Sequence, residues 1–255
     1  MMIHADTSAL VIGGTQGLGL AIAERLRAEG CTRLVITGRD RAKGETAAAG
    51  LGAHFLPVDL ADTQATIRLV DEAAERLGGL NALATSAAAT DRGSILDTDP
   101  ALWDRLMAIN VRSPFFALQR FVQRAIATGH PAAAVNILSM VVHCGQTFLA
   151  PYSASKAALA NVTRNAASTL RHHRIRVNGI NCGWMDTPGE DAVQRRFHGA
   201  GDDWLEKAEA RQPFGTLVKP AHVAGLAAYM LGSGSGVMTG SIVDFDQNVA
   251  GAYPE

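Results

Sequence analysis

The chain has 255 residues, of which 47% are hydrophobic and 18% charged, and its formal net charge is −1. This length can bury a full core as one α/β domain, and the near-neutral charge gives no reason to expect a nucleic acid or a membrane surface as partner. Three widely spaced cysteines without a CxxC pair are typical of free thiols in a reducing compartment. The start shows no secretory signal, and no apolar run is long enough to span a bilayer. We therefore expect a cytoplasmic protein.

The first part of the chain is typical of a nucleotide-binding unit. Residues 8–13 are a short apolar run, as expected of a strand buried on both faces of a parallel sheet, and residues 20–30 predict an amphipathic helix. Between them, residues 13–19 follow the pattern G-x-x-x-G-x-G. Glycines let the backbone approach a pyrophosphate, and the helix N-terminus offers N–H groups to it. A flexible turn without a ligand is the alternative, but the position after the first strand favours dinucleotide binding.

The end of the second expected strand, residues 33–37, bears on the choice of cofactor. NAD calls for an acidic residue here to hold the ribose 2′-hydroxyl, whereas NADP calls for an arginine to pair with the 2′-phosphate. Gly38 stands where the acid would be, Arg39 lies beside it, and Asp40 is expected to cap a helix that starts near Arg41. We therefore favour NADP. The alternative is that Arg39 is an ordinary exposed arginine in a protein that takes NAD as well.

The remaining pattern predicts strands that alternate with helices. Further strands are expected over residues 53–58, 80–85, 132–139, 175–181 and 241–245, and helices over 62–77, 100–128, 151–172 and 220–231. Residues 184–213 mix glycine, proline, tryptophan and charge, which indicates an irregular substrate lid. The fold class expected over residues 1–255 is therefore α/β, as a single doubly wound domain with a parallel sheet of about seven strands and helices on both faces.

Tyr152 and Lys156 are the strongest chemical signal in the sequence. They are four residues apart on an expected helix, so both side chains project from one face, and Ser139 ends the strand before that helix. An ammonium beside a phenol favours the phenolate, and a serine hydroxyl can hold a substrate oxygen while the tyrosine moves a proton. This trio suits the interconversion of an alcohol and a carbonyl. The pair alone is also compatible with a solvated helix face that carries a half-buried tyrosine.

With these motifs placed, the chain resembles the short-chain dehydrogenase/reductase family over nearly its whole length. The family's T-G-x-x-x-G-x-G turn resembles residues 12–19, with Ile12 in place of threonine. Its catalytic asparagine, serine, tyrosine and lysine fall on Asn110, Ser139, Tyr152 and Lys156.

The resemblance also implies a cofactor shell, which departs from the family pattern at several positions. The expected residues are Gly13, Thr15, Gln16, Gly17, Leu18, Gly19, Arg39, Asp59, Leu60, Ser86, Ala87, Ala88, Tyr152, Lys156, Gly183, Met185 and Thr187. Asp59 takes the place of the family aspartate that contacts adenine. The family's N-N-A-G is replaced by residues 85–88, Cys182 replaces a proline, and Gln16 replaces a basic residue found in many NADP-binding members. These departures concern the affinity and choice of cofactor, not the four catalytic residues.

The implied activity is an oxidoreductase that interconverts a secondary alcohol and a ketone by hydride transfer to or from a nicotinamide cofactor, NADP with NAD possible. The resemblance gives Tyr152 the proton transfer and Ser139 the substrate oxygen. Lys156 would lower the pKa of the tyrosine and hold the nicotinamide ribose. Asn110, through a kinked helix and a water, would connect Lys156 to solvent. A catalytically silent dinucleotide-binding sensor or scaffold is the alternative, supported by the departures at Ile12, Ser86, Ala88 and Cys182.

The expected partner is a small alcohol or carbonyl compound. Its pocket would include Ser139, Val141, His143, Tyr152 and Trp184. His143 could bond a substrate hydroxyl, although a loop histidine satisfied by the protein is the plainer interpretation. No histidine or cysteine spacing suggests a metal site. Members of this family are usually homo-dimers or homo-tetramers built on the two long helices, here 100–128 and 151–172, and we expect the same of this chain.

Overall fold

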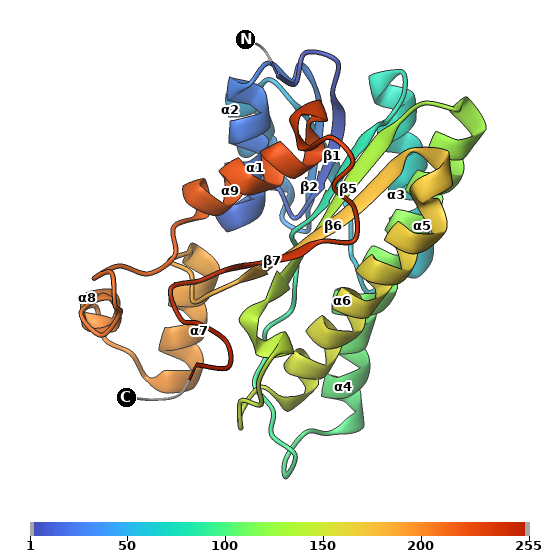
Figure 1. The fold of residues 1–255 in the computed structure, drawn as a ribbon. Helices are drawn as coiled ribbons and strands as arrows, with labels where there is room; N and C mark the ends of the chain where they lie inside the picture. The colour runs from blue at the N-terminus through green and yellow to red at the C-terminus, as the bar shows by residue number, and fades with distance from the viewer. Residues whose placement is uncertain (1–2, 253–255) are drawn as a thin grey trace.

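The computed structural model describes residues 3–252 and has one seven-stranded, fully parallel sheet at its centre (Figure 1). The strand order is β3-β2-β1-β4-β5-β6-β7. The strands are β1 (Ser8–Ile12), β2 (Arg33–Gly38), β3 (His54–Pro57), β4 (Ala82–Thr85), β5 (Ala132–Ser139), β6 (Ile175–Cys182) and β7 (Ile242–Phe245). All residues of β1 and β4 are buried, because helices cover both faces of the sheet. The predicted α/β fold class, a doubly wound parallel sheet, is confirmed.

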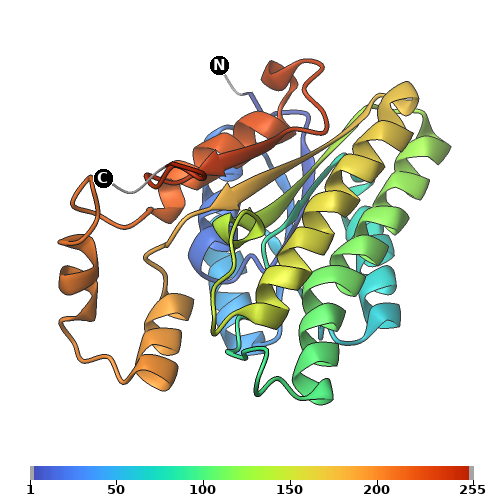
Figure 2. The same ribbon diagram turned by 60° about the horizontal axis from the view of Figure 1, so that its bottom comes forward.

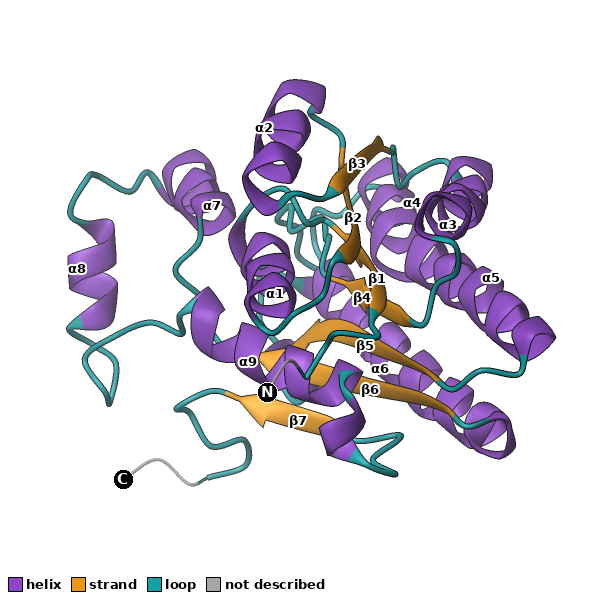
Figure 3. Ribbon diagram, turned by 90° about the horizontal axis from the view of Figure 1, so that it is seen from above, coloured by secondary structure: helices purple, strands orange, loops and turns teal. Residues whose placement is uncertain are grey.

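Two helical layers enclose the sheet (Figure 3). One layer contains α1 (Gly17–Ala28), α2 (Arg41–Leu51) and α9 (Pro220–Leu231), and its apolar side chains share a core with one face of the sheet. The other contains α3 (Thr63–Leu77), α5 (Ser113–Thr128) and α6 (Ala150–Leu170), which share a second core with the opposite face. Because β1 lies between β2 and β4, the strand order reverses there, and a crevice opens beyond the strands' carboxyl ends.

Side-chain caps fix where two of these helices begin. Asp40 accepts a hydrogen bond from the Lys43 backbone N–H at 3.0 Å, and Asp62 accepts one from the Ala65 N–H at 2.9 Å. An N-cap carboxylate satisfies an N–H that has no partner inside the helix. The expected capping role of Asp40 is therefore present in the structure, and its carboxylate is used at the start of α2.

The expected helix over residues 100–128 is interrupted. It consists of α4 (Pro100–Met107), a π-helical turn (Ala108–Arg112) and α5. The turn places Asn110 at its centre, where the side chain is buried. A π-turn inserts an extra residue into the helix, which kinks it and redirects one side chain.

The segment predicted as a substrate lid is more regular than the sequence suggested. Residues 184–213 contain two helices, α7 (Pro188–His198) and α8 (Trp204–Glu209), so the expectation of an irregular excursion was wrong. Thr187 caps α7 by accepting a hydrogen bond from the Glu190 N–H at 3.0 Å, and proline occupies the first helical position. The two helices lie apart from those that cover the sheet (Figures 1 and 2, orange). Within residues 3–252, no helix combines the length and the apolar character needed to cross a membrane.

Candidate active site

A cavity of about 1610 Å³ opens beyond the carboxyl ends of the central strands. All the residues predicted to bind cofactor or substrate line it, and so do Ser139, Tyr152 and Lys156. Asn110 is the exception among the predicted site residues, because it lies buried behind the cavity wall. Segments that are far apart in the sequence therefore meet around one space, as the topology of the sheet requires.

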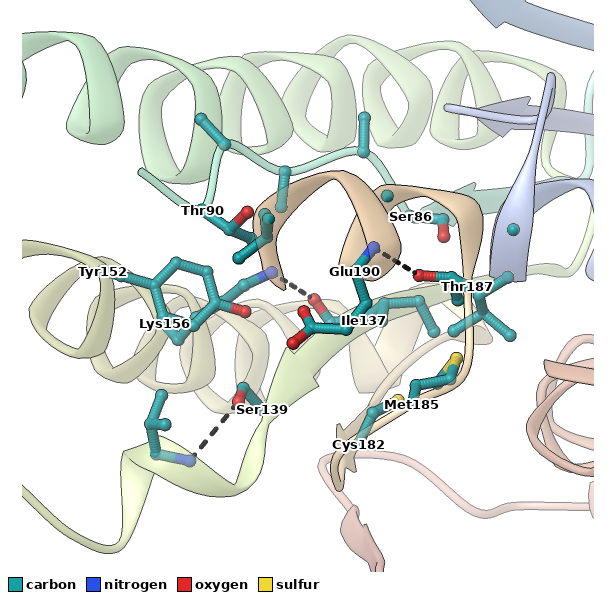
Figure 4. A pocket seen from close by; sticks show the side chains of 18 of the residues that line it. Ser86, Thr90, Ile137, Ser139, Tyr152, Lys156, Cys182, Met185, Thr187 and Glu190 are labelled. Atoms are coloured by element: carbon teal, nitrogen blue, oxygen red, sulfur yellow. Dashed lines mark hydrogen bonds between the residues drawn. The ribbon is translucent and has the colours of Figure 1, made fainter. Parts of the chain in front are cut away.

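Ser139, Tyr152 and Lys156 lie together on one wall of this cavity (Figure 4). Ser139 is the last residue of β5, and the other two are one turn apart on α6. The Lys156 ammonium is buried and donates to the Ile137 carbonyl oxygen at 2.9 Å. Its nitrogen lies 5.8 Å from the centre of the Tyr152 ring. The strand end and the helix thus place a hydroxyl, a phenol and an ammonium side by side.

The protonation of Tyr152 differs from our expectation. Burial raises the pKa of Tyr152 to about 12, although a hydrogen bond with Ser139 acts in the opposite direction. Burial also lowers the pKa of Lys156 to about 8. The pKa of Tyr152 is thus raised and not lowered as we expected from Lys156, because loss of hydration is the largest effect on this phenol. Tyr152 is therefore a neutral phenol near pH 7 and is ready to donate its proton.

Asn110 fixes the position of the loop that follows β4. Its Oδ1 accepts from the Ala89 N–H at 2.8 Å, and its Nδ2 donates to the Ala89 carbonyl oxygen at 2.9 Å. The same Nδ2 donates to the Ser155 hydroxyl oxygen at 3.0 Å, and that hydroxyl donates to the Tyr152 carbonyl oxygen at 2.7 Å. Asn110 therefore connects the loop to the α6 turn that carries Tyr152. Its observed contacts are structural, and a water link to Lys156 stays a prediction.

The glycine turn after β1 fits a phosphate-bearing ligand. Gly13 has a φ of 83°, in the left-handed region that favours glycine. A Cβ added at Gly19 would lie 2.0 Å from the Gly13 carbonyl oxygen, so no other residue fits there without movement. Helix α1 begins within this turn, at Gly17, and its first N–H groups have no partner inside the helix. The turn therefore presents backbone donors at close approach, as a pyrophosphate requires.

The cavity beyond β2 is lined by positive side chains. Arg39 is exposed there, and Lys43, which the sequence reasoning missed, donates to the Gln16 side-chain oxygen at 2.8 Å. A Cβ at Gly38 would come within 2.8 Å of the Thr15 side chain, which leaves little room for an acid at that position. Lys43 lies in the first turn of α2, just after the strand end that carries Arg39, and this position could have indicated it.

The substrate end of the cavity includes His143 and Trp184, as predicted. His143 already has partners, since its Nε2 lies 2.9 Å from Asp244 Oδ1 and 3.1 Å from Asn181 Nδ2. These contacts favour the plainer interpretation of a histidine satisfied by the protein. Trp184 donates from Nε1 to Glu190 Oε1 at 2.8 Å.

Several charged residues that line the cavity were not predicted, namely Arg92 and Glu190 together with Asp91, Arg105 and Arg196. Arg92 comes from the loop after β4, and Glu190 comes from the first turn of α7. No motif indicated either of them, because both belong to segments whose course over the cavity is set by tertiary structure.

Cys182, which stands where the family pattern has proline, is a buried thiol at the end of β6. Burial raises the pKa of this thiol to about 12, and the Lys156 ammonium acts in the opposite direction. Cys182 is therefore an uncharged, space-filling group near pH 7.

Comparisons with known proteins agree on one group. A family profile described as "Enoyl-(Acyl carrier protein) reductase" matches residues 13–248. An NADP-dependent (R)-specific alcohol dehydrogenase of Lentilactobacillus kefiri is 30% identical over 91% of this chain and 92% of that protein. A sorbitol dehydrogenase of Cereibacter sphaeroides is 30% identical over 88% of this chain and 89% of that protein. The solved structure of a variant actinorhodin polyketide ketoreductase with NADPH superposes with a TM-score of 0.88, at 26% identity over 97% and 99% of the two chains.

Proposed function

This chain belongs to the short-chain dehydrogenase/reductase family of oxidoreductases, and on that premise we propose that it interconverts a secondary alcohol and a ketone with NADP(H). The observation that carries the proposal is the meeting of Ser139, Tyr152 and Lys156 on one wall of a cavity that also contains the glycine turn. One cavity contains a proton donor, a hydroxyl that can bind oxygen and a turn of the dinucleotide-binding type. Together these features indicate one oxidoreductase active site.

The proposed chemistry divides between a cofactor and the side chains. A bound nicotinamide cofactor would supply or accept the hydride. In the reducing direction, neutral Tyr152 donates its proton to the carbonyl oxygen as negative charge develops there, while the Ser139 hydroxyl donates a hydrogen bond to the same oxygen. Lys156 would hold the ribose next to the nicotinamide. In the oxidising direction Tyr152 accepts the proton.

The preference for NADP is supported by the charges beyond β2. Arg39 and Lys43 line that part of the cavity, and a 2′-phosphate needs such cations. A ribose 2′-hydroxyl would need an acceptor there. Asp40 also lines this part of the cavity and uses Oδ1 to accept from the Lys43 N–H as the helix cap, so two cations stand there against one carboxylate. The Lentilactobacillus kefiri relative is named as NADP-dependent.

The rival function, a silent nucleotide-binding sensor or scaffold, has weaker support. The departures at Ser86 and Ala88 lie in the cofactor shell. The loop still forms there, since the Ser86 and Ala87 N–H groups donate to the Ile12 carbonyl oxygen at 2.9 and 3.1 Å. Nothing in these departures removes the proton donor, so an active enzyme is the better explanation.

We also propose that the chain forms a homo-dimer or homo-tetramer through its two long helical segments, α4–α5 and α6. Trp103, Phe115 and Ile126 on these helices are between 41% and 42% exposed, which is high for large apolar side chains. Burying them against a second copy would remove this apolar surface from water. Sedimentation or mass photometry would give the oligomeric state directly.

The proposed function is tested by a matched turnover screen. Purified protein is assayed with NADPH and NADH against ketones and aldoses, and with NADP⁺ and NAD⁺ against secondary alcohols and polyols. We expect turnover of at least one class, faster with the phosphorylated cofactor. Cofactor binding without oxidation or reduction across the whole panel would instead support the sensor.

A further inference from the structure

Arg92 and Glu190 bring opposite charges to the substrate end of the cavity from two different walls. Arg92 belongs to the loop that Asn110 holds after β4, whereas Glu190 belongs to lid helix α7. Both line the same space as Tyr152. Neither has a part in the mechanism described above.

Arg92 is held in place without a carboxylate partner. Its Nη1 donates to the Thr90 carbonyl oxygen at 3.2 Å, and its Nε donates to His198 Nε2 at 3.3 Å. Its guanidinium carbon lies 5.3 Å from the centre of the Phe148 ring. Among the described residues Arg92 forms no ion pair, since the neighbouring Asp91 pairs with Arg105 and Arg196 instead. A half-buried guanidinium has five N–H donors, so donors remain for a ligand.

Glu190 is held through one of its two carboxylate oxygens. Oε1 accepts from Trp184 Nε1 at 2.8 Å and from Gln194 Nε2 at 2.7 Å. The described residues provide no hydrogen bond to Oε2. In Figure 4 the side chain extends from α7 toward Tyr152 and Lys156. A fixed carboxylate with one free oxygen is a strong acceptor for a hydroxyl group.

Arg92 and Glu190 line the same cavity as Tyr152, and the charges of both act on its phenol. Burial is the main cause that raises the pKa of Tyr152, and the Glu190 carboxylate raises it further while Arg92 lowers it. Burial likewise lowers the pKa of Arg92, and Glu190 and Tyr152 act in the opposite direction. Since all three groups line one cavity, the parts of a substrate adjoining its reacting carbon would lie between them.

Asp91, Arg105 and Arg196 also line the cavity, but Asp91 pairs with both of these arginines. Among the described residues Arg92 and Glu190 therefore remain as two opposite charges without an ionic partner, and such a pair favours a particular kind of ligand. A carboxylate on the substrate would suit Arg92 but would be repelled by Glu190, and a plain hydrocarbon would leave both charges without partners. A hydroxyl group both accepts and donates, so neighbouring hydroxyls can accept from Arg92 and donate to Glu190.

We propose that Arg92 and Glu190 bind hydroxyl groups flanking the reacting carbon, and that the substrate is therefore a neutral polyhydroxylated ketone or the matching polyol. This inference rests on the proposed oxidoreductase function and adds the class of substrate. It makes Arg92 and Glu190 residues that determine specificity, while proton transfer stays with Tyr152.

The test compares polyols with a plain alcohol in matched variants. Wild type, Glu190→Gln and Arg92→Lys are assayed with NADP⁺ on a panel of polyols and on cyclohexanol. Glu190→Gln keeps the shape and the contacts of Oε1 but removes the charge. Arg92→Lys keeps the charge but removes the planar fork of donors. Glu206→Gln, an exposed position on α8 outside this cavity, is the matched control.

We expect each active-site variant to lower kcat/KM for the best polyol by about tenfold or more, because a charge-assisted hydrogen bond is lost. Cyclohexanol turnover should change by less than about threefold, within the context dependence of such effects. Glu206→Gln should match wild type on both. Equal losses on both substrates would overturn the inference, because they would indicate general damage to the site.

A second readout does not depend on turnover. Polyol binding to the Tyr152→Phe variant loaded with NADP⁺ is measured by calorimetry, with and without Glu190→Gln. Weaker binding with Glu190→Gln supports the inference, and no polyol binding overturns it. Turnover of cyclohexanol without turnover or binding of any polyol would overturn this inference and leave the proposed function intact. Polyol binding without any turnover would refute the proposed function instead.

Discussion

Replacing Asn110 by alanine should lower the stability of the protein as well as its rate of turnover. Asn110 is 1% exposed and makes three hydrogen bonds, two to the Ala89 backbone and one to the Ser155 hydroxyl. Alanine would leave the buried N–H and carbonyl of Ala89 without these partners. Each unsatisfied buried group costs about 1–3 kcal/mol. Alanine also favours a helix over asparagine, which offsets a few tenths of a kcal/mol.

We therefore expect a loss of about 3 kcal/mol in the free energy of unfolding, equivalent to a fall in Tm of roughly 6–12 °C for a chain of this size. Urea unfolding followed by circular dichroism measures the first quantity, and calorimetry measures the second. The control is Asn161→Ala, an exposed position on α6 with no side-chain hydrogen bond in the described residues, which should change stability by about 0.5 kcal/mol or less. Loss of activity in Asn110→Ala with wild-type stability would refute the structural role and favour a proton relay alone.

Two further predictions concern charge. Removing both Arg39 and Lys43 by alanine substitution should weaken NADPH binding by about tenfold or more and leave NADH binding nearly unchanged, because only the 2′-phosphate needs these cations. Calorimetry with both cofactors measures the two affinities. Equal losses of affinity for NADPH and NADH would contradict the prediction. His4 is fully buried, and burial lowers its pKa below 6.5, so the folded protein resists its protonation. The contribution of His4 to stability is complete above the pKa that the histidine has in the unfolded chain, about 6.5, and it is lost as the pH falls below that value. The free energy of unfolding then falls by up to about 1.4 kcal/mol per pH unit. Urea unfolding at a series of pH values should therefore show a steeper acid loss in wild type than in His4→Gln, whereas the exposed His130→Gln should follow wild type.

The architecture could be predicted because local pattern and tertiary environment agree. Strand β5 and helix α9 begin and end where the apolar runs and flanking residues indicated. The glycine turn was also predictable, since its spacing alone restricts what the backbone can do. At Asp40 the residue type identified the cap before the helix was known.

Other features depend on contacts that no local pattern contains. The π-turn at Asn110 is stabilised by hydrogen bonds to Ala89 and Ser155, which are 21 and 45 residues away. The lid was predicted as irregular because its glycine and proline residues, which begin and end α7, conceal the helix between them. Arg92 and Glu190 become neighbours of Tyr152 only in the folded chain. The pKa of Tyr152 depends on burial, which a sequence pattern does not measure.

Proton transfer by Tyr152 is most directly tested by single-turnover kinetics of a Tyr152→Phe variant. NADPH oxidation is followed after mixing with a ketone that wild type reduces, and NADPH binding is measured separately. We predict that phenylalanine, which keeps the ring and removes only the hydroxyl, leaves NADPH binding within about twofold of wild type and lowers the rate of the chemical step by at least about a hundredfold. A Tyr152→Phe protein that oxidises NADPH at the wild-type rate would contradict the role assigned to this residue.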